Sequence, residues 1–127
     1  MTFRLQDANV RVAELKQMVR KFSEERDWDQ FHNAKDLAIG IVTEASELLD
    51  SFRFKSEIEV EELFGNEASA KNIRDELSDV FYFALRLAQK YDIDISNSLE
   101  EKIRQNAKKY PVERARGSNK KYTELGS

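Results

Sequence analysis

Apolar residues recur at steps of three and four over much of the chain, the spacing that places them on one face of an α-helix. Val12, Leu15, Val19 and Phe22 show this spacing early in the sequence. Only four glycines and one proline interrupt the chain, which leaves few places for the turns of an all-β fold. The sequence therefore predicts an all-α protein, with helices over about residues 6–26, 33–52 and 68–91, a short helix after Ser56, and a last helix that begins at Ser96 or Ser98 and ends near Tyr110.

Residues at the ends of these patterns support the predicted boundaries. Asn33 and Ser56 each precede a helical pattern and have an acidic residue three positions later, as in a capping box. Pro111 predicts the end of the last helix, because proline cannot donate the hydrogen bond that continues a helix. Residues 112–127 are largely polar and show no periodicity. We therefore expect one domain over residues 1–111, followed by an extended C-terminal tail.

Two pairs of carboxylates lie inside the apolar patterns. In the helix predicted over residues 33–52, Glu44 falls within the apolar stripe and Glu47 lies at its edge. In the helix predicted over residues 68–91, Glu76 lies within the stripe and Asp79 borders it. Each helix is expected to present one inward carboxylate and one at the rim. The two stripes are formed by Leu37, Ile41, Leu48 and Phe52 and by Ile73, Val80, Ala84 and Leu87.

These acids predict a site for a hard cation. An ionised carboxylate in an apolar setting is unfavourable unless a positive charge neutralises it. Four acids from two facing helices offer only oxygen ligands, which suit Mg²⁺ or Mn²⁺ better than zinc. Glu44, Glu47, Glu76 and Asp79 are therefore the candidate metal ligands.

The four acids also allow two alternatives to a metal site. Acids three residues apart are common on solvated helix faces, and Asp50 and Asp75, which project to the far sides of their helices, fit that alternative. The acids could also form salt bridges between helices in a non-catalytic oligomer that binds a nucleotide or a protein partner. That hypothesis requires basic residues facing the acids, whereas the basic residues cluster near the helix ends or elsewhere, at Lys35, Lys71, Arg74 and Arg86.

Length and composition narrow the classes of function. A chain of 127 residues with 40% hydrophobic residues can form a single domain with a core. The net charge of −3 argues against a nucleic-acid-binding surface, which needs Lys and Arg to neutralise phosphates. The lack of cysteine excludes disulfides, Cys-based zinc sites and thiol nucleophiles, and the single histidine excludes multi-His metal centres. No signal segment and no stretch of about 20 apolar residues is visible, so we expect a soluble, cytoplasmic protein without a membrane partner.

The acid pairs and their flanking segments point to a known family. The pairs read as an ExxE motif at residues 44–47 followed by an ExxD motif at residues 76–79. With these motifs and their flanks, the chain resembles the all-α nucleoside triphosphate pyrophosphohydrolases of the MazG-like group, most closely the dCTP pyrophosphatase branch. The flanks give the resemblance its specificity and occur in the expected order over nearly the whole chain, at residues 25–32 (ERDWDQFH), 75–80 (DELSDV), 109–111 (KYP) and 121–125 (KYTEL).

The resemblance implies a fold, an assembly and a reaction. The fold would have four main helices per subunit, assembled as a homodimer or as a tetramer built from two dimers. The reaction would cleave a nucleoside triphosphate, dCTP first, between the α- and β-phosphates and so remove surplus or modified nucleotides. Glu44, Glu47, Glu76 and Asp79 would hold Mg²⁺, with Mn²⁺ as a possible substitute, and Glu47 would hold or deprotonate the attacking water.

The resemblance also implies substrate contacts. Trp28 and Phe54 would flank the base, with Phe83 completing the wall of the pocket. His32 is expected to be structural, packing its loop or capping the helix that follows. The triphosphate or the sugar would meet Lys55, Asn106, Lys109 and Tyr110, and Lys121 of the tail could reach a neighbouring subunit.

Three positions depart from the dCTP-specific pattern. Val19 replaces a histidine near the base, Phe54 replaces a tryptophan, and Phe83 replaces a tyrosine. These changes keep apolar volume but remove polar groups, which favours a broader deoxynucleotide preference over strict selection of cytosine. Preference for dUTP, or for ribonucleotides including alarmones, is an alternative that shares the same metal site.

Overall fold

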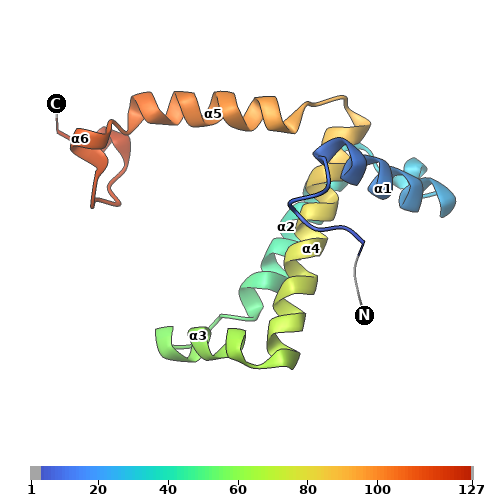
Figure 1. The fold of residues 1–127 in the computed structure, drawn as a ribbon, viewed down its shortest axis with the longest axis horizontal. Helices are drawn as coiled ribbons and strands as arrows, with labels where there is room; N and C mark the ends of the chain where they lie inside the picture. Colours follow the sequence, from blue (N-terminus) through green and yellow to red (C-terminus); the bar gives the residue numbers. More distant parts are fainter. Residues whose placement is uncertain (1–3, 127) are drawn as a thin grey trace. The chain divides into compact units, whose positions relative to one another are not determined.

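The structure, a computed structural model, describes residues 4–126, and every regular element in that range is a helix (Figure 1). The predicted all-α fold class is therefore confirmed. Within residues 4–126, no helix combines the length and the hydrophobicity that a membrane span requires. The chain divides after Asp92 into two compact units. The elements are α1 (Val12–Glu25), η1 (Asp29–Phe31), α2 (Ala34–Asp50), α3 (Glu57–Gly65), α4 (Glu67–Lys90), α5 (Ile95–Lys109), α6 (Val112–Ala115) and η2 (Tyr122–Glu124).

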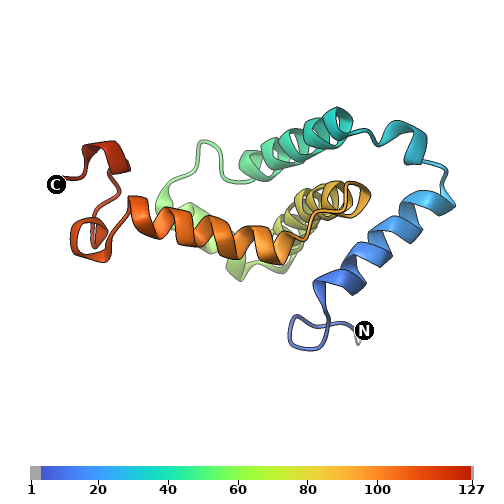
Figure 2. The ribbon, with the colours of Figure 1, turned by 90° about the horizontal axis from the view of Figure 1, so that it is seen from above.

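Helix α4 is the centre of the first unit, because α1, α2 and α3 all pack against it. Helices α2 and α4 run antiparallel. Near the start of α4, Asn72 Nδ2 donates a 3.4 Å hydrogen bond to Ser51 Oγ, just after the end of α2. Near the end of α4, Arg86 contacts His32, just before α2 begins. The chain reverses direction between α1 and α2 through the segment that contains η1 (Figure 2). The acid-bearing stretches of α2 and α4 therefore face each other.

The core of this unit follows the predicted apolar stripes. Leu37 on α2 is completely buried and Ile73 on α4 is 6% exposed, while the other stripe residues are half-buried. Leu85 and Ala88 are also buried, although they lie beside the predicted stripe of α4. The buried surface of α4 is wider than one stripe because α1 and α3 cover it as well as α2.

Two of the predicted helix caps are confirmed. Asn33 Oδ1 accepts a 2.8 Å hydrogen bond from the backbone N–H of Asp36 at the start of α2. At the start of α3, Ser56 Oγ accepts from the N–H of Glu59 at 3.2 Å, and the Glu59 carboxylate accepts from the N–H of Ser56 at 3.1 Å. These bonds satisfy N–H groups that have no partner within the helix. The acid-bearing helix α2 thus begins where the sequence predicts.

The predicted starts of the first and last helices are wrong. Helix α5 is capped by Asp94, whose Oδ1 accepts a 2.9 Å hydrogen bond from the N–H of Asn97, and not by Ser96 or Ser98. Aspartate is as good an N-cap as serine, so Asp94 can start the helix before Ser96 is reached. Helix α1 begins only at Val12, because residues 6–9 form a turn in which Asn9 Oδ1 accepts from the N–H of Gln6 at 2.8 Å.

The second unit contains α5, α6 and η2. The segment after α5 folds back so that the rings of Tyr110 and Tyr122 lie 6.1 Å apart, and Lys109 Nζ lies 5.0 Å from the centre of the Tyr122 ring. The two short helices after Pro111 differ from the extended tail expected there, since single turns are too short to produce a hydrophobic period. The domain over residues 1–111 stays a prediction, and residues 1–3 and 127 lie outside the described part of the chain.

Candidate functional site

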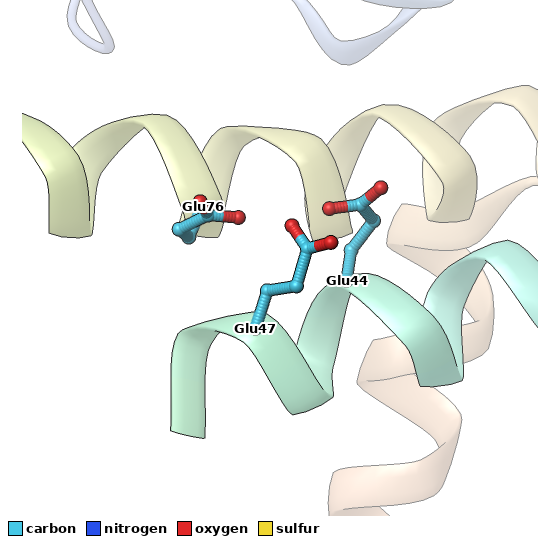
Figure 3. Close-up of side chains that lie close together, drawn as sticks. All are labelled: Glu44, Glu47 and Glu76. Atoms are coloured by element: carbon cyan, nitrogen blue, oxygen red, sulfur yellow. The ribbon is translucent and has the colours of Figure 1, made fainter. Parts of the chain in front are cut away.

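Three carboxylates converge between α2 and α4. Glu44 and Glu47 project from α2 and Glu76 projects from α4, and the three side chains point toward one another (Figure 3). One oxygen from each carboxylate lies within 4.8 Å of the others. The spacing of three residues puts Glu44 and Glu47 on one face of α2, and the antiparallel packing brings Glu76 opposite them. Three of the four predicted metal ligands, Glu44, Glu47 and Glu76, thus form one cluster.

Two of these carboxylates have oxygen atoms without protein partners. Glu44 Oε2 and Glu76 Oε2 are buried and form no hydrogen bond with any described residue. Glu47 is exposed, so the cluster is open to solvent on one side. Buried acceptors without donors are unfavourable, and a cation held by all three carboxylates would satisfy them. The donor set is entirely oxygen, which fits a hard divalent cation.

The cluster perturbs the acidity of its own members. Burial raises the pKa of Glu44 to about 7, and hydrogen bonding with Glu47 and the charges of Glu47, Asp79 and Glu76 add to the effect. The pKa of Glu76 is also raised, chiefly by hydrogen bonding with Glu47 and then by burial. Without a cation, the negative charges crowd one another and favour protonation. Raised pKa values of this kind are typical of acid clusters that bind metal or take part in chemistry.

The raised pKa of Glu44 predicts a pH dependence of stability for the metal-free protein. The ordinary pKa of a glutamate is 4.5, so Glu44 binds more protons in the folded state than in the unfolded state across the interval up to about 7. Its contribution to stability is fully present below pH 4.5 and is lost as the pH rises through 7. In EDTA, the free energy of unfolding measured with urea should therefore fall between pH 5 and pH 8.

The control for this prediction is Glu44→Gln, which keeps the shape of the side chain but does not titrate. The decrease between pH 5 and pH 8 should be clearly smaller in Glu44→Gln than in the wild type. Equal slopes in the two proteins would contradict the assignment of the pH dependence to Glu44.

Asp79 lies beside the cluster, and its charge raises the pKa of both Glu44 and Glu76. The Asp79 side chain is exposed and, together with Glu44, lines a cavity next to the cluster. The structure thus brings all four predicted acids into one region, with Asp79 at the edge that faces the cavity.

The basic residues of α4 pair elsewhere. Lys71 Nζ lies 2.7 Å from Asp75, Arg74 lies 3.0 Å from Glu67, and Arg86 pairs with Asp29. The hypothesis that the four acids form interhelical salt bridges required such residues to face the acids. The ion pairs of α4 therefore do not support it.

A cavity of about 590 Å³ adjoins the acids. It contains Trp28 and Phe83, two of the three aromatic residues expected to contact a base. Val19, at the position expected near the base, lines it as well. The cavity therefore joins an aromatic wall to the acid cluster. Its lining residues are Met18, Val19, Phe22, Trp28, Glu44, Ser78, Asp79, Tyr82 and Phe83.

Aromatic rings form a connected wall of this cavity. The ring centroids of Phe22 and Trp28 are 5.6 Å apart, those of Phe22 and Tyr82 are 5.9 Å apart, and those of Tyr82 and Phe83 are 5.2 Å apart, all in edge-on geometry. The Tyr82 hydroxyl lies 2.5 Å from Ser23 Oγ, which is completely buried. This bond joins α4 to α1 behind the wall.

Several residues of the cavity were not predicted from the sequence: Met18, Phe22, Ser78 and Tyr82. The helical spacing of the sequence could have indicated two of them, Phe22 and Tyr82. Phe22 lies three positions after Val19, on the same face of α1, and Tyr82 lies three positions after Asp79 on α4. Only the packing of α1 on α4 brings these two faces together.

Two predicted substrate residues lie in the first unit but do not line the cavity. Phe54 is 92% exposed, and its backbone is in the left-handed region, with a φ of 65°. The Arg53 guanidinium lies 4.8 Å from the centre of its ring. Lys55 lines a separate depression of about 450 Å³ together with Glu59 and Asn66. The roles expected of Phe54 and Lys55 stay predictions.

The other predicted contacts belong to the second unit. Asn106 and Lys109 lie on α5, and Tyr110 is its C-terminal cap. Their roles toward a nucleotide also stay predictions.

Gly40 on α2 makes room for the ring of Phe83. A Cβ atom at position 40 would lie 2.6 Å from Cδ1 and Cε1 of Phe83 and 2.8 Å from its Cγ. Real Cβ atoms do not approach other atoms so closely, so the ring or the two helices would have to move. The glycine therefore holds α2 and α4 at the separation that both the cavity wall and the acid cluster need.

Replacing Gly40 by alanine is expected to destabilise the protein by about 1–3 kcal/mol, the usual effect of overpacking. Urea unfolding measures the change. Gly65→Ala is the matched control, because a Cβ at Gly65 meets no atom within 4 Å. That variant should be neutral or slightly more stable, since alanine favours helix. Equal stabilities of the two variants would contradict the proposed close approach.

Two comparisons with known proteins point to the same family. The model of the MazG-like family matches residues 39–125, more than half of the chain. The chain is 33% identical over 112 residues to dCTP pyrophosphatase 1 of Rattus norvegicus and 32% identical to that of Homo sapiens. Each match covers 88% of this chain and 66% of the relative, so the chain spans just under two thirds of the length of these proteins.

A solved structure agrees with the sequence comparisons. A pyrophosphatase from Archaeoglobus fulgidus superposes with a TM-score of 0.74 at 28% sequence identity, covering 85% of this chain and 99% of the archaeal one. The matched fold thus includes most of the chain and nearly the whole of the neighbour. On the family model and these relatives together, the chain belongs to the MazG-like family.

Proposed function

We propose that the protein hydrolyses deoxynucleoside triphosphates, with dCTP favoured, to the monophosphate and pyrophosphate in a reaction that requires Mg²⁺. The observation that carries this proposal is the cluster of carboxylates at the edge of an aromatic cavity. Glu44 belongs to both the cluster and the cavity, and Asp79 lines the cavity beside the cluster. The names of the rat and human relatives, dCTP pyrophosphatase 1, support the choice of substrate. Such an activity would remove surplus or modified nucleotides from the pool.

The proposed metal ligands are Glu44, Glu47, Glu76 and Asp79. The buried oxygen atoms of Glu44 and Glu76 lack any other partner among the described residues, and this supports their role. When bound, Mg²⁺ would supply Lewis-acid polarisation of the substrate phosphates and neutralise negative charge on the departing pyrophosphate. Mn²⁺ prefers the same oxygen ligands and should substitute for it.

Glu47 is the proposed catalytic residue. It is the exposed member of the cluster, so water can reach its carboxylate. Its neighbours Glu44 and Glu76 have raised pKa values, and both owe part of the increase to Glu47. In the proposed mechanism, Glu47 orients a water molecule toward the α-phosphate and accepts its proton as the bond to the pyrophosphate breaks.

The base is proposed to lie against Trp28 and Phe83 in the cavity. Stacking on aromatic rings gives affinity but little choice between bases. Phe54 and Lys55 are proposed to contact the base and the phosphates, respectively. The second unit's Asn106, Lys109 and Tyr110 are each proposed to contact the triphosphate or the sugar of a nucleotide.

Exposed apolar residues support assembly into a homodimer or a tetramer. On α2, Ile39 is 51% exposed, Val42 is 66% exposed and Leu49 is 59% exposed. Phe81 on α4 is 51% exposed. Apolar surface of this extent is typical of a chain that buries part of it against another copy.

The cavity wall predicts weak selection between bases. Val19 and Phe83 offer no hydrogen bond to a base edge, and apolar pockets distinguish similar ligands only weakly. In a pyrophosphate-release assay with Mg²⁺, dCTP should rank first, and dTTP and dUTP should follow within about tenfold in kcat/KM. Release from none of the five common dNTPs, with Mg²⁺ or Mn²⁺ present, would contradict the proposed function. A much higher rate with dUTP or a ribonucleotide would reassign the substrate.

A further inference from the structure

Arg86 is the largest completely buried side chain of the described residues, with 1% of its surface exposed. An arginine remains charged in a protein, and a buried charge is unfavourable unless it is paired and hydrogen-bonded. Arg86 lies on α4 outside the carboxylate cluster, and no step of the proposed reaction uses it. Its burial therefore needs a separate physical reason.

The guanidinium of Arg86 is fully engaged on one loop and on its own helix. Its Nε donates a 3.1 Å hydrogen bond to Nδ1 of His32, one terminal nitrogen donates to the carboxylate of Asp29, and the other donates to Gln89. Lys90 strengthens the attachment, because its Nζ donates a 2.8 Å hydrogen bond to the backbone carbonyl of Asp29. Two consecutive turns of α4 thus hold the loop around Asp29.

The protonation states of the two loop partners suit these bonds. Hydrogen bonding with Arg86 is the main cause that lowers the pKa of Asp29, so its carboxylate is ionised. Burial, followed by the charges of Arg86 and Lys90, lowers the pKa of His32. A neutral imidazole with its proton on Nε2 can accept at Nδ1 from Arg86. His32 therefore has the structural role that the sequence predicted.

Trp28 lies between the anchored residues and the cavity. It immediately precedes Asp29, and its ring centroid is 6.3 Å from that of His32. On the α1 side, the backbone N–H of Trp28 donates a 3.0 Å hydrogen bond to the backbone carbonyl of Ser23. The backbone of Asp27 adopts a φ of 53°, which turns the chain sharply out of α1. The position of Trp28 is thus set from α1 on one side and from Arg86 on the other.

We propose that Arg86 is a positioning residue that, through Asp29 and His32, fixes Trp28 as a wall of the nucleotide cavity and so determines the affinity for the base. This inference rests on the proposed function for its kinetic consequence. Its structural part concerns only the order of Trp28 and does not depend on turnover. Because the effect is on binding of the base and not on the carboxylate cluster, loss of Arg86 should raise KM and leave kcat nearly unchanged.

The test uses the intrinsic fluorescence of Trp28, which is the only tryptophan of the chain. Arg86→Met removes the guanidinium and keeps most of the apolar stem. Arg74→Met is the matched control, because Arg74 lies on the same helix and its side chain forms an exposed ion pair with Glu67. Quenching of Trp28 by acrylamide is measured without nucleotide, and kcat and KM are measured with dCTP and Mg²⁺. Circular dichroism confirms that each variant retains its helices.

In Arg86→Met, quenching should increase about twofold or more and KM should rise about tenfold, the range expected when one base-stacking contact is partly lost. Its kcat should stay within about twofold of the wild type. Arg74→Met should match the wild type in all three. A folded Arg86→Met protein with unchanged quenching and KM would overturn the proposal.

Asp29→Asn keeps the test valid if Arg86→Met fails to fold, because the Asp29 side chain is half exposed and the substitution preserves its shape. It should shift quenching and KM in the same direction by a smaller factor, and the absence of both shifts would overturn the proposal. If the wild type releases no pyrophosphate from any dNTP, the proposed function fails. The quenching comparison still decides whether Arg86 orders Trp28.

Discussion

Replacing Glu47 by glutamine is expected to reduce kcat for pyrophosphate release about 10²- to 10⁴-fold, the range found when a general base is removed. Glu47 meets Glu44 and Glu76 in one cluster (Figure 3). Its side chain is the exposed member of that cluster, so water can reach it. Glutamine has almost the same shape but cannot accept a proton or carry a negative charge. KM should change little, because the cavity that would bind the base does not include Glu47. Initial rates of pyrophosphate release over a range of dCTP concentrations measure both constants.

Asp50→Asn is the matched control for this substitution. Asp50 is also an acid of α2, lies three residues after Glu47, is exposed, and is 3.7 Å from Arg53. Its loss removes the same charge from the same helix without touching the cluster. Activity near that of the wild type is expected for Asp50→Asn. Equal losses in the two variants would indicate a general effect of helix charge, and full activity of Glu47→Gln would exclude Glu47 as the base.

Removing divalent metal is expected to abolish turnover and to lower stability. Without a cation, a triphosphate would approach several carboxylates of the same sign, so EDTA should reduce the rate by more than about a thousandfold. The buried oxygens of Glu44 and Glu76 would also lose the partner proposed for them. A ligand that binds only the folded state at 100 times its Kd stabilises that state by about 2.7 kcal/mol. Mg²⁺ at that concentration should raise the free energy of unfolding by a similar amount.

Variants on α2 and α4 separate specific binding from general salt effects. Glu44→Gln should weaken Mg²⁺ binding in isothermal titration calorimetry and reduce the stabilisation by Mg²⁺. Asp75→Asn should behave as the wild type, because Asp75 is exposed and pairs with Lys71. Turnover that persists in EDTA, or stabilisation by Mg²⁺ that is equal in all three proteins, would contradict a metal site at the cluster.

The clustering of the acids could be predicted because the spacing that produces it is local in sequence. Glu44 and Glu47 occupy one face of a helix by spacing alone, and so do Glu76 and Asp79. An apolar stripe through each pair indicates that the two faces meet. The cluster in the structure contains three of these acids, with Asp79 beside them.

The shape of the cavity could not be predicted in the same way. Phe22 and Tyr82 lie far apart in the sequence and meet only because α1 packs on α4. Gly40 is inconspicuous in the sequence, because the reason for a glycine there is the Phe83 ring of another helix. Contacts of this kind depend on the crossing of helices, which periodicity does not specify.

The burial of Arg86 could not be predicted from the pattern of apolar and polar residues. A charged residue is normally assigned to a solvated face, and the sequence pattern groups Arg86 with basic residues that lie away from the acids. Arg86 can be buried because its guanidinium donates hydrogen bonds to Asp29 and His32. Both partners lie on a loop more than 50 positions earlier in the sequence. A buried charge with distant partners leaves no local signal in the sequence.

The carboxylate cluster and the adjoining cavity are proposed to cleave a nucleoside triphosphate between its α- and β-phosphates. Phosphorus NMR of dCTP incubated with the protein and Mg²⁺ tests this most directly, since it identifies every product. We expect dCMP and pyrophosphate to appear in equal amounts with the wild type, and far less of both to form in the same time with Glu47→Gln. Formation of dCDP and inorganic phosphate, or unchanged dCTP with the folded wild-type protein, would contradict the proposed cleavage.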